Sequence, residues 1–384
     1  MQRMPFPVRH DLAERAATLG FDFIETDEEP YWDESVCYRF TLSQIEDDLE
    51  SATTELAAMC VELVGDIIGD EHALERLHIP RHAWEVIADS WKRRDPSLYG
   101  RLDFSYDGLG PPKLLEYNAD TPTALYEAAV FQWHWLEDAR AAGTLPPDAD
   151  QFNSLHERLI ERWRDIARGR RLHLARMPES IEDVGTVAYL EDCARQAGLA
   201  TDVLAISDIG LRDGIFTDLR ERPIEQLFKL YPWEWMFADA FGKDSALRSL
   251  RCIEPAWKAI LSNKGFLALL WSNWPNHPNL LETRFDDGSA SMRGADYVRK
   301  PLYSREGANV RIVRSGRIDA ETPGTYGSEG YVRQALAPLP DFDGFYPVIG
   351  SWVVGEHPAG IGIREDRSLI TSDRSRFVPH WIAS

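Results

Sequence analysis

The chain has 384 residues, enough for two or three domains, and 44% of them are hydrophobic, which excludes a disordered protein. Its 63 acidic residues outnumber 42 Lys and Arg residues, and the formal charge of −21 argues against general binding of nucleic acid or anionic membranes. The longest apolar runs, such as 266–271, are far shorter than the ~20 residues of a membrane span. Four scattered cysteines without a CxxC pair, and ten histidines without HExxH, are typical of reduced thiols in a cytoplasmic protein and do not favour a His or Cys metal site.

The periodicity of apolar residues divides the chain into three regions, 1–95, 96–255 and 256–384. The first is mainly helical, with helices over 41–63, capped by Thr41 or Ser43, and over 81–92. The second is mixed α/β: a β-hairpin spans 101–119, and helices cover 123–141, 151–167 and 186–197. The third begins with a helix over 254–271. Its antiparallel strands are expected at the following positions: 296–302, 310–313, 330–335, 346–354 and 360–364.

The predicted hairpin carries an unusual set of polar side chains. Strict alternation places Arg101 and Asp103 on one face of the first strand, and Glu116 and Asn118 on one face of the second. The turn brings Asp103 opposite Glu116, so two carboxylates and an amide form a set of oxygen ligands suited to Mg²⁺, with an arginine for an anion. The hydroxyl-rich segment 120–123 that follows is expected to cap the next helix. Two alternatives remain: a solvated cross-strand ion-pair network, or the acid and base of a glycosidase.

The last third of the chain contains groups that could bind phosphate, although neither GxxxxGK[ST] nor GxGxxG occurs. Lys264 lies in the segment SNKGFLALLW, and Lys300 ends the strand DYVRKPL. The loop YSREGANV follows at once and could close over a triphosphate with its backbone N–H groups, Gly307 and Arg305. Arg364 ends a strand beside two acidic residues and could stabilise a transferring phosphoryl group. Alternatively, these are ordinary surface lysines and an ion-pair cluster.

Taken together, these motifs resemble the glutathionylspermidine synthase family of ATP-grasp ligases. The segments that carry the resemblance are, in chain order, RLDFSYDG, LLEYNADTPT, SNK, VRKPLYSREGAN, VRQALAPLP and GIGIREDRSLI. The resemblance is to a stand-alone synthetase without the amidase domain of bifunctional members. It implies an α+β ATP-grasp fold with an antiparallel-sheet nucleotide-binding half (256–384) and a mixed α/β substrate and Mg²⁺ half (96–255).

The resemblance also implies roles for individual residues. Two Mg²⁺ ions would be bound by Asp103, Glu116 and Asn118. Arg101 would contact ATP phosphate and the activated carboxylate, and Arg305 and Arg364 would serve the closing loop and the phosphate site. ATP would further contact Lys264, Lys300, Gly307 and the adenine hinge of Gln334, Ala335 and Leu336. The peptide and polyamine substrates would meet Thr121, Glu182 and Asp183, whereas Leu230 replaces a substrate-binding threonine of the family.

The implied reaction is amide formation by an ADP-forming acid–amine ligase: ATP phosphorylates a carboxylate, and an amine displaces phosphate from the acyl phosphate. A glutathione-like peptide and a polyamine are the leading substrates, and the family suggests a homodimer. Two alternatives are the same chemistry on another acid and amine, and a non-catalytic ATP-binding sensor.

Overall fold

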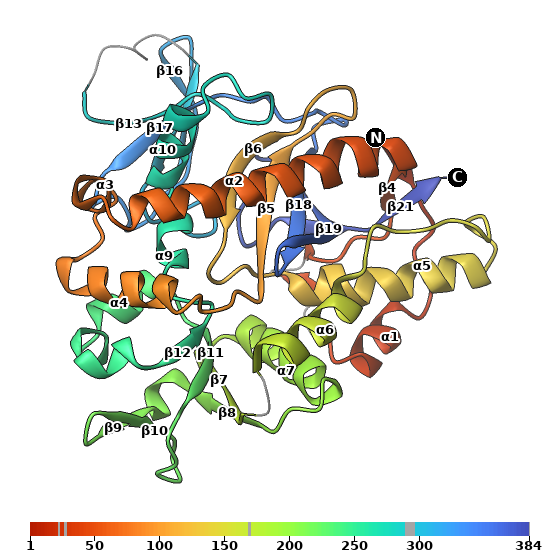
Figure 1. The fold of residues 1–384 in the computed structure, drawn as a ribbon. Coiled ribbons are helices and arrows are strands. Elements are labelled where there is room, and N and C mark those ends of the chain that lie inside the picture. The colour runs from red at the N-terminus through yellow and green to blue at the C-terminus, as the bar shows by residue number, and fades with distance from the viewer. Residues whose placement is uncertain (22–23, 27–28, 168–169, 289–295, 384) are drawn as a thin grey trace.

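The predicted hairpin lies at one edge of a five-stranded antiparallel sheet in the computed structural model, which describes residues 1–383 except 22–23, 27–28, 168–169 and 289–295 (Figure 1). The sheet has the order β20-β19-β18-β5-β6. Its strands are β5 (Tyr99–Ser105), β6 (Lys113–Asn118), β18 (Tyr346–Val354), β19 (His357–Asp366) and β20 (Arg376–Val378). Asp103 is paired with Glu116, as predicted, and a bulge at Leu115 follows directly.

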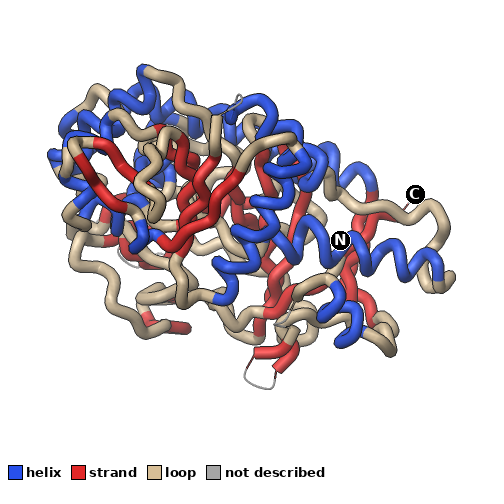
Figure 2. Tube along the Cα trace, turned by 90° about the horizontal axis from the view of Figure 1, so that it is seen from below, coloured by secondary structure: helices blue, strands red, loops and turns tan. Residues whose placement is uncertain are grey.

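The two faces of this sheet have different neighbours. Leu102 and Phe104 point into the largest hydrophobic core, which α2 (Ser51–Ile67) covers. The opposite face packs on α6 (Leu155–Ala167) through Trp352 and carries Arg101, so the alternation of the sequence separates core from site. Figure 1 shows α2 crossing the sheet, and Figure 2 shows from below that helices lie on both sides of the strands.

A second antiparallel sheet lies in the last third of the chain, in the order β13-β17-β14-β15-β16. Its strands are β13 (Thr283–Phe285), β14 (Tyr297–Pro301), β15 (Arg311–Arg314), β16 (Arg317–Glu321) and β17 (Tyr331–Ala335). The prediction of a single C-terminal sheet is wrong, because β18 and β19 pair with the hairpin at β5 instead. The strands at 296–302, 310–313, 330–335 and 346–354 are confirmed within a residue or two, and that at 360–364 is longer than predicted.

The predicted helix over 254–271 is in fact two helices, α9 (Lys258–Leu261) and α10 (Gly265–Asn273). The side chain of Asn263 causes the break: its amide donates to the carbonyl of Leu77, and its oxygen accepts the N–H of Gly265. This local hydrogen bonding competes with a continuous helix and leaves Lys264 at the N-terminus of α10.

The middle of the chain forms a four-stranded parallel sheet in the order β12-β11-β7-β8, as expected for a mixed α/β region. Its strands are β7 (Leu172–Arg176), β8 (Thr201–Ala205), β11 (Gln226–Leu230) and β12 (Arg251–Ile253). The helices α6 and α7 (Ile181–Gln196) pack against it, and α8 (Trp233–Ala238) follows β11. A small hairpin, β9 (Gly210–Arg212) and β10 (Ile215–Thr217), projects from this region.

The first region contains the helices α1 (Leu12–Thr18), α3 (Glu71–Arg76) and α4 (Arg81–Lys92). The helix α5 (Gln132–Ala141) follows the hairpin in the second region. The first region also has strands that were not predicted: β1 (Gln2–Pro5), β2 (Glu25–Thr26), β3 (Glu29–Pro30) and β4 (Val36–Thr41). The C-terminal β21 (His380–Ala383) pairs in parallel with β4, which brings both ends of the chain to one sheet (Figure 1).

Helix termini were predicted with uneven accuracy. The helix over 81–92 is confirmed exactly. The long helix after Thr41 is also confirmed: the Thr41 hydroxyl accepts the N–H of Gln44 while the Gln44 side chain accepts the N–H of Thr41, a capping box. It continues through a π-helical segment (Gln44–Glu50) into α2. By contrast, α6 begins four residues later than predicted, and α7 begins five residues earlier, at Ile181, directly after Ser180, whose hydroxyl caps it.

The four cysteine thiols are free and buried. Among the described residues, none of the helices is both long and apolar enough to cross a membrane. The three-part division of the chain stays a prediction.

Candidate active site

A cleft with an empty volume of about 1440 Å³, its open mouth included, lies between the hairpin of the central sheet and the second antiparallel sheet. Most of the residues proposed from the sequence line it. They are Arg101, Asp103, Glu116, Asn118, Thr121, Lys264, Lys300, Arg305, Gly307, Leu336 and Arg364. The register of β5 with β6 and β18 therefore gathers side chains that are up to 263 positions apart in the sequence.

Asp103 is the centre of the site. Its carboxylate accepts two hydrogen bonds from the Arg101 guanidinium, at 2.6 and 3.0 Å, and one from Arg364 at 2.7 Å. The Asn118 amide donates to Asp103 at 3.1 Å and to Glu116 at 3.3 Å. Arg101 and Asp103 are 5% and 2% exposed, so a solvated cross-strand network, the alternative from the sequence, is wrong.

The backbone of β18 makes room for this arrangement. Gly350 is paired with Asp103, and a Cβ atom at Gly350 would lie 2.7 Å from the Cδ of Arg101. The Arg101 guanidinium also lies 5.4 Å from the Trp352 ring centroid, a distance at which a cation interacts with an aromatic face. Gly350 thus leaves space for the Arg101 side chain, and Trp352, two residues later, contacts its guanidinium.

Two lysines approach Glu116, Lys264 from the start of α10 and Lys300 from β14 of the second sheet. The Nζ of Lys264 lies 3.2 Å from the Glu116 carboxylate and donates to the carbonyl of Ser304 at 3.0 Å. The Nζ of Lys300 donates to the Leu115 carbonyl at 2.9 Å and to the Gln334 side chain at 2.8 Å. The bulge at Leu115 and the β14–β17 pairing of Val298 with Gln334 thus help to position this lysine.

These charges shift one another's pKa values. Burial alone would raise the pKa of Glu116, but Lys264 and Lys300 hold it well below its usual range. Burial lowers the pKa of Lys300 to about 8 although Glu116 opposes the change. Burial and the nearby charge of Arg101 also lower the pKa of Arg364. Four cationic side chains therefore face two carboxylates, and the surplus positive charge favours an anion in the cleft.

The loop 303–309 covers one side of the cleft. Arg305 donates to the Thr121 hydroxyl at 2.7 Å, lies 3.3 Å from the Glu234 carboxylate and sits over the Trp235 ring. Gly307 has φ +68°, and a Cβ atom there would lie 2.4 Å from the carbonyl oxygen of Thr371. Only glycine allows both this backbone angle and so close an approach of the backbone at Thr371.

Four proposed residues lie outside the cleft wall. Gln334 is buried behind Lys300, next to Ala335 on β17, whereas Glu182 and Asp183 start α7 on the substrate side. Burial and the nearby Glu127 raise the pKa of Glu182 to about 7, and burial also raises the pKa of Asp183. Leu230 is buried in the core of the parallel sheet, so this position adds no polar group to the cleft.

Sequence reasoning missed two residues near the cleft, Glu234 and Lys229. The segment 120–123 was expected to cap the next helix, but the Asp120 carboxylate instead accepts a hydrogen bond from the Lys229 ammonium at 2.6 Å and one from the N–H of Trp233, at the start of α8, at 2.8 Å. Lys229 lies in an apolar strand, QLFKL, and a lone lysine there was the available signal that a buried carboxylate must face it.

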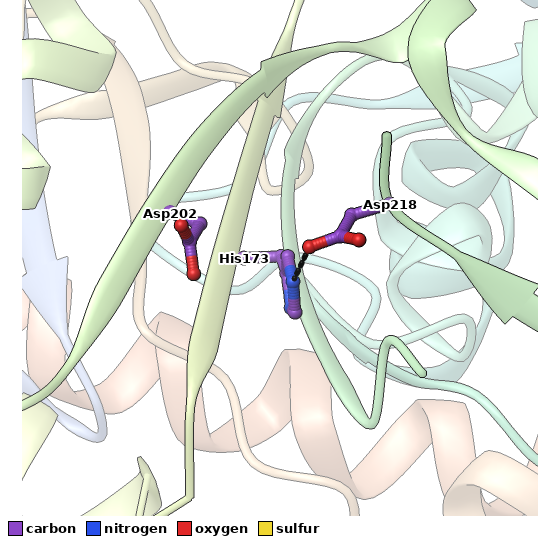
Figure 3. Close-up of side chains that lie close together, drawn as sticks. All are labelled: His173, Asp202 and Asp218. Atoms are coloured by element: carbon purple, nitrogen blue, oxygen red, sulfur yellow. Dashed lines mark hydrogen bonds and ion pairs between the residues drawn. The ribbon is translucent and has the colours of Figure 1, made fainter. Parts of the chain in front are cut away.

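A separate cluster lies in the parallel-sheet region, where His173, Asp202 and Asp218 offer ligand atoms within 4.8 Å of one another (Figure 3). The Nε2 of His173 lies 3.3 Å from Asp218. The Arg222 guanidinium, however, lies 2.9 Å from Asp202 and 2.6 Å from Asp218. An arginine therefore already supplies the positive charge between the two aspartates, and the cluster ties the β9–β10 hairpin region to the sheet.

Residues 3–383 match the family model described as glutathionylspermidine synthase preATP-grasp. The chain belongs to the glutathionylspermidine synthase family. It is 42% identical to a protein assigned as an acid–amine ligase in Haemophilus influenzae, with 98% of each chain covered. It is 28% identical to the trypanothione synthetase of Crithidia fasciculata and 27% identical to the bifunctional glutathionylspermidine synthetase/amidase of Escherichia coli. The matches cover 84% and 87% of this chain and 53% and 57% of those longer proteins.

Among solved structures, the fold resembles a glutathione synthetase-like effector from Globodera pallida, with a TM-score of 0.52 and 10% identity over 90% of this chain and 89% of that one. The likeness concerns the fold alone. The prediction of an α+β ATP-grasp fold is confirmed, and the family of this chain consists of ligases that join an acid to an amine.

Proposed function

We propose that this protein is an ADP-forming ligase that uses ATP to join a carboxylate to an amine through an acyl phosphate. One observation carries the proposal: Arg101, Arg364, Lys264 and Lys300 converge on only two carboxylates in a cleft of a chain whose net charge is −21. A triphosphate and a carboxylate bring about five negative charges together, and such a site would offset them.

Mg²⁺ fits the donor set of the cleft. Asp103 and Glu116 supply carboxylate oxygens, and Asn118, whose N–H groups donate to both carboxylates, supplies an amide oxygen. We propose that these residues would hold two Mg²⁺ ions, whose positive charge would help to neutralise the phosphates. Both guanidinium groups of Arg101 and Arg364 lie at the Asp103 carboxylate. With Mg²⁺ bound to that carboxylate, the two arginines would turn toward the transferring phosphoryl group.

The remaining residues of the cleft would bind and shield ATP. Lys264 and Lys300 would contact phosphate, while Leu336 would line the adenine side and Gln334 and Ala335 would support it from behind the cleft wall. The loop 303–309 would cover the phosphates with backbone N–H groups and Arg305, and so exclude the water that hydrolyses an acyl phosphate.

The substrate side favours a peptide acid and a polycationic amine. Thr121 and Arg305 would contact the peptide carboxylate. Glu182, Asp183 and the buried Glu127 form an acidic group behind Thr123, which hydrogen-bonds to Glu182, and would attract a polyamine. Relatives named for glutathionylspermidine and trypanothione support a glutathione-like and a polyamine-like pair.

ADP release by the purified protein with ATP and Mg²⁺ tests the proposal. It is measured alone, with glutathione, with spermidine, and with both, and the amide product is identified by mass spectrometry. We expect ADP and amide in equal amounts only when an acid and an amine are both present. If ATP binds but none of a panel of peptides and amines yields ADP, the ligase proposal fails and a non-catalytic ATP-binding role takes its place.

A further inference from the structure

A buried ion pair joins the cleft to the parallel sheet. Asp120 and Lys229 are 2% and 0% exposed, and their charged atoms are 2.6 Å apart. The second oxygen of Asp120 accepts the N–H of Trp233, and Lys229 also donates to the Tyr231 carbonyl at 2.9 Å. Because both carboxylate oxygens are occupied inside the protein, Asp120 is held as a structural link although it lies only two residues after Asn118 in the sequence.

This link fixes the spacing of two groups that bind the same arginine. Thr121 follows Asp120 directly, and Glu234 follows Trp233 directly. Arg305 bridges the Thr121 hydroxyl and the Glu234 carboxylate, with Trp235 beneath its guanidinium. We call Thr121, Glu234 and Trp235 the loop receptor, because together they receive the tip of loop 303–309.

We propose that Asp120 and Lys229 are positioning residues that hold the two halves of the loop receptor at the separation Arg305 bridges, so that the loop closes only over a correctly assembled substrate side. The pair acts on the reaction through the loop receptor and Arg305. This inference rests on the proposed function for its catalytic consequence, but the loop contact itself exists independently of any reaction.

The chemistry of the pair supports positioning. A buried Lys–Asp pair adds little to the free energy of unfolding, because the cost of desolvating both charges offsets much of their attraction. Its short hydrogen bonds nevertheless fix the relative positions of the segments that they join. Each partner here makes a second hydrogen bond to the backbone around α8, so a shift of Asp120 moves the start of that helix and Glu234 with it. A displacement of even 1 Å in a receptor of this kind is expected to weaken loop closure.

Cleavage by trypsin after Arg305 tests the inference directly, because trypsin needs the arginine side chain that the receptor holds. The variant D120L/K229M replaces the pair by apolar groups of similar size. A matched control, R9M/E34Q, alters another ion pair with a fully buried carboxylate, which lies among the N-terminal residues and outside the residues that line the cleft. The new N-terminus at Glu306 is quantified by mass spectrometry at a temperature where each variant is folded.

We expect cleavage after Arg305 about tenfold faster in D120L/K229M and unchanged within about twofold in the control. In ligase assays the kcat of D120L/K229M should fall about tenfold with KM for ATP nearly unchanged, since the hydrogen bonds of Lys264 and Lys300 go to Ser304, Leu115 and Gln334 and not to the pair. Cleavage at the wild-type rate, or equal acceleration in both variants, would overturn the inference. If D120L/K229M does not fold, the variant Asp120→Glu takes its place, because it keeps the charge but displaces the segment that carries Thr121. Unchanged protection of Arg305 from trypsin in that variant would also contradict the inference.

The two proposals fail separately. If the wild-type protein forms no amide but D120L/K229M exposes Arg305 selectively, the positioning inference stands and the ligase proposal does not. If amide forms normally and Arg305 stays protected in D120L/K229M, the ligase proposal stands and the positioning inference is wrong.

Discussion

The two sides of the cleft are built by different means. On the nucleotide side, Lys300, Gln334, Asp103 and Glu116 lie on paired strands, where register fixes which side chains meet. On the substrate side, Thr121, Glu182 and Glu234 lie in a loop or in the first turn of a helix, held by contacts between distant segments. The strand-built side is suited to a constant ligand such as ATP, and the loop-built side can change with the substrate.

The largest effect should come from the strand-built side. Lys300→Met removes a buried cation beside Glu116, and we expect kcat/KM for ATP to fall at least about 10³-fold, because phosphate charge is then less well neutralised. Asp103→Asn should have a similar effect, because it removes the negative charge of a proposed metal ligand.

Lys243→Met, at an exposed position, is the control for loss of a lysine elsewhere. Steady-state ADP release measures all three variants. If K300M keeps activity within tenfold of wild type, Lys300 does not contact the phosphates and the comparison of the two sides fails.

The next largest effect should come from the loop that joins the two sides. Gly307→Ala places a Cβ atom 2.4 Å from the Thr371 carbonyl oxygen at φ +68°, so the loop must move. We expect kcat to fall about 10²-fold and ATP hydrolysis without amide formation to rise, because water enters the cleft. Gly288→Ala is the control, since it has a similar φ of +81° but nothing within 4 Å of an added Cβ. Equal effects of the two substitutions would show that strain, and not the contact with Thr371, is responsible.

On the loop-built side, pH should have a measurable effect. Burial and Glu127 raise the pKa of Glu182 from 4.5 to about 7, so this carboxyl loses its charge below about pH 7 and the KM for the amine should rise as pH falls. The same shift means that ionisation of Glu182 costs folding stability as pH rises from 4.5 through 7.

Glu182→Gln should therefore raise the free energy of unfolding by about 2 kcal/mol at pH 8 and by little at pH 4.5. Denaturant unfolding at the two pH values measures this difference. A Gln variant that is less stable than wild type at pH 8 would show that the charged carboxylate is well solvated in the fold.

The smallest effect on activity should come from the His173 cluster. Arg222→Met leaves Asp202 and Asp218 without the shared guanidinium, and we expect a lower unfolding free energy with unchanged kcat per folded molecule. Differential scanning calorimetry and ADP release measure the two quantities. Added Zn²⁺ that restored stability in R222M but also stabilised the wild type would instead indicate a metal site in the native protein.

The same contrast explains what could be predicted from the sequence. Alternation and turn chemistry were sufficient to place Asp103 opposite Glu116, and a family resemblance brought Lys264, Lys300 and Arg364 to the same site. The break at Asn263 and the pairing of β18 with β5 were not predictable, because they depend on partners at Leu77 and on strands about 250 positions away. The pairing of Asp120 with Lys229 was not predictable for the same reason, because the two residues are 109 positions apart.

The most direct test of the ligase account is an isotope transfer. The protein is incubated with ATP, Mg²⁺, spermidine and glutathione labelled with ¹⁸O in its glycine carboxylate. If the carboxylate attacks the γ-phosphorus and the amine then displaces phosphate, one ¹⁸O atom passes to each inorganic phosphate released with the amide. Amide formation with unlabelled phosphate, or with the label in AMP, would contradict an acyl phosphate intermediate.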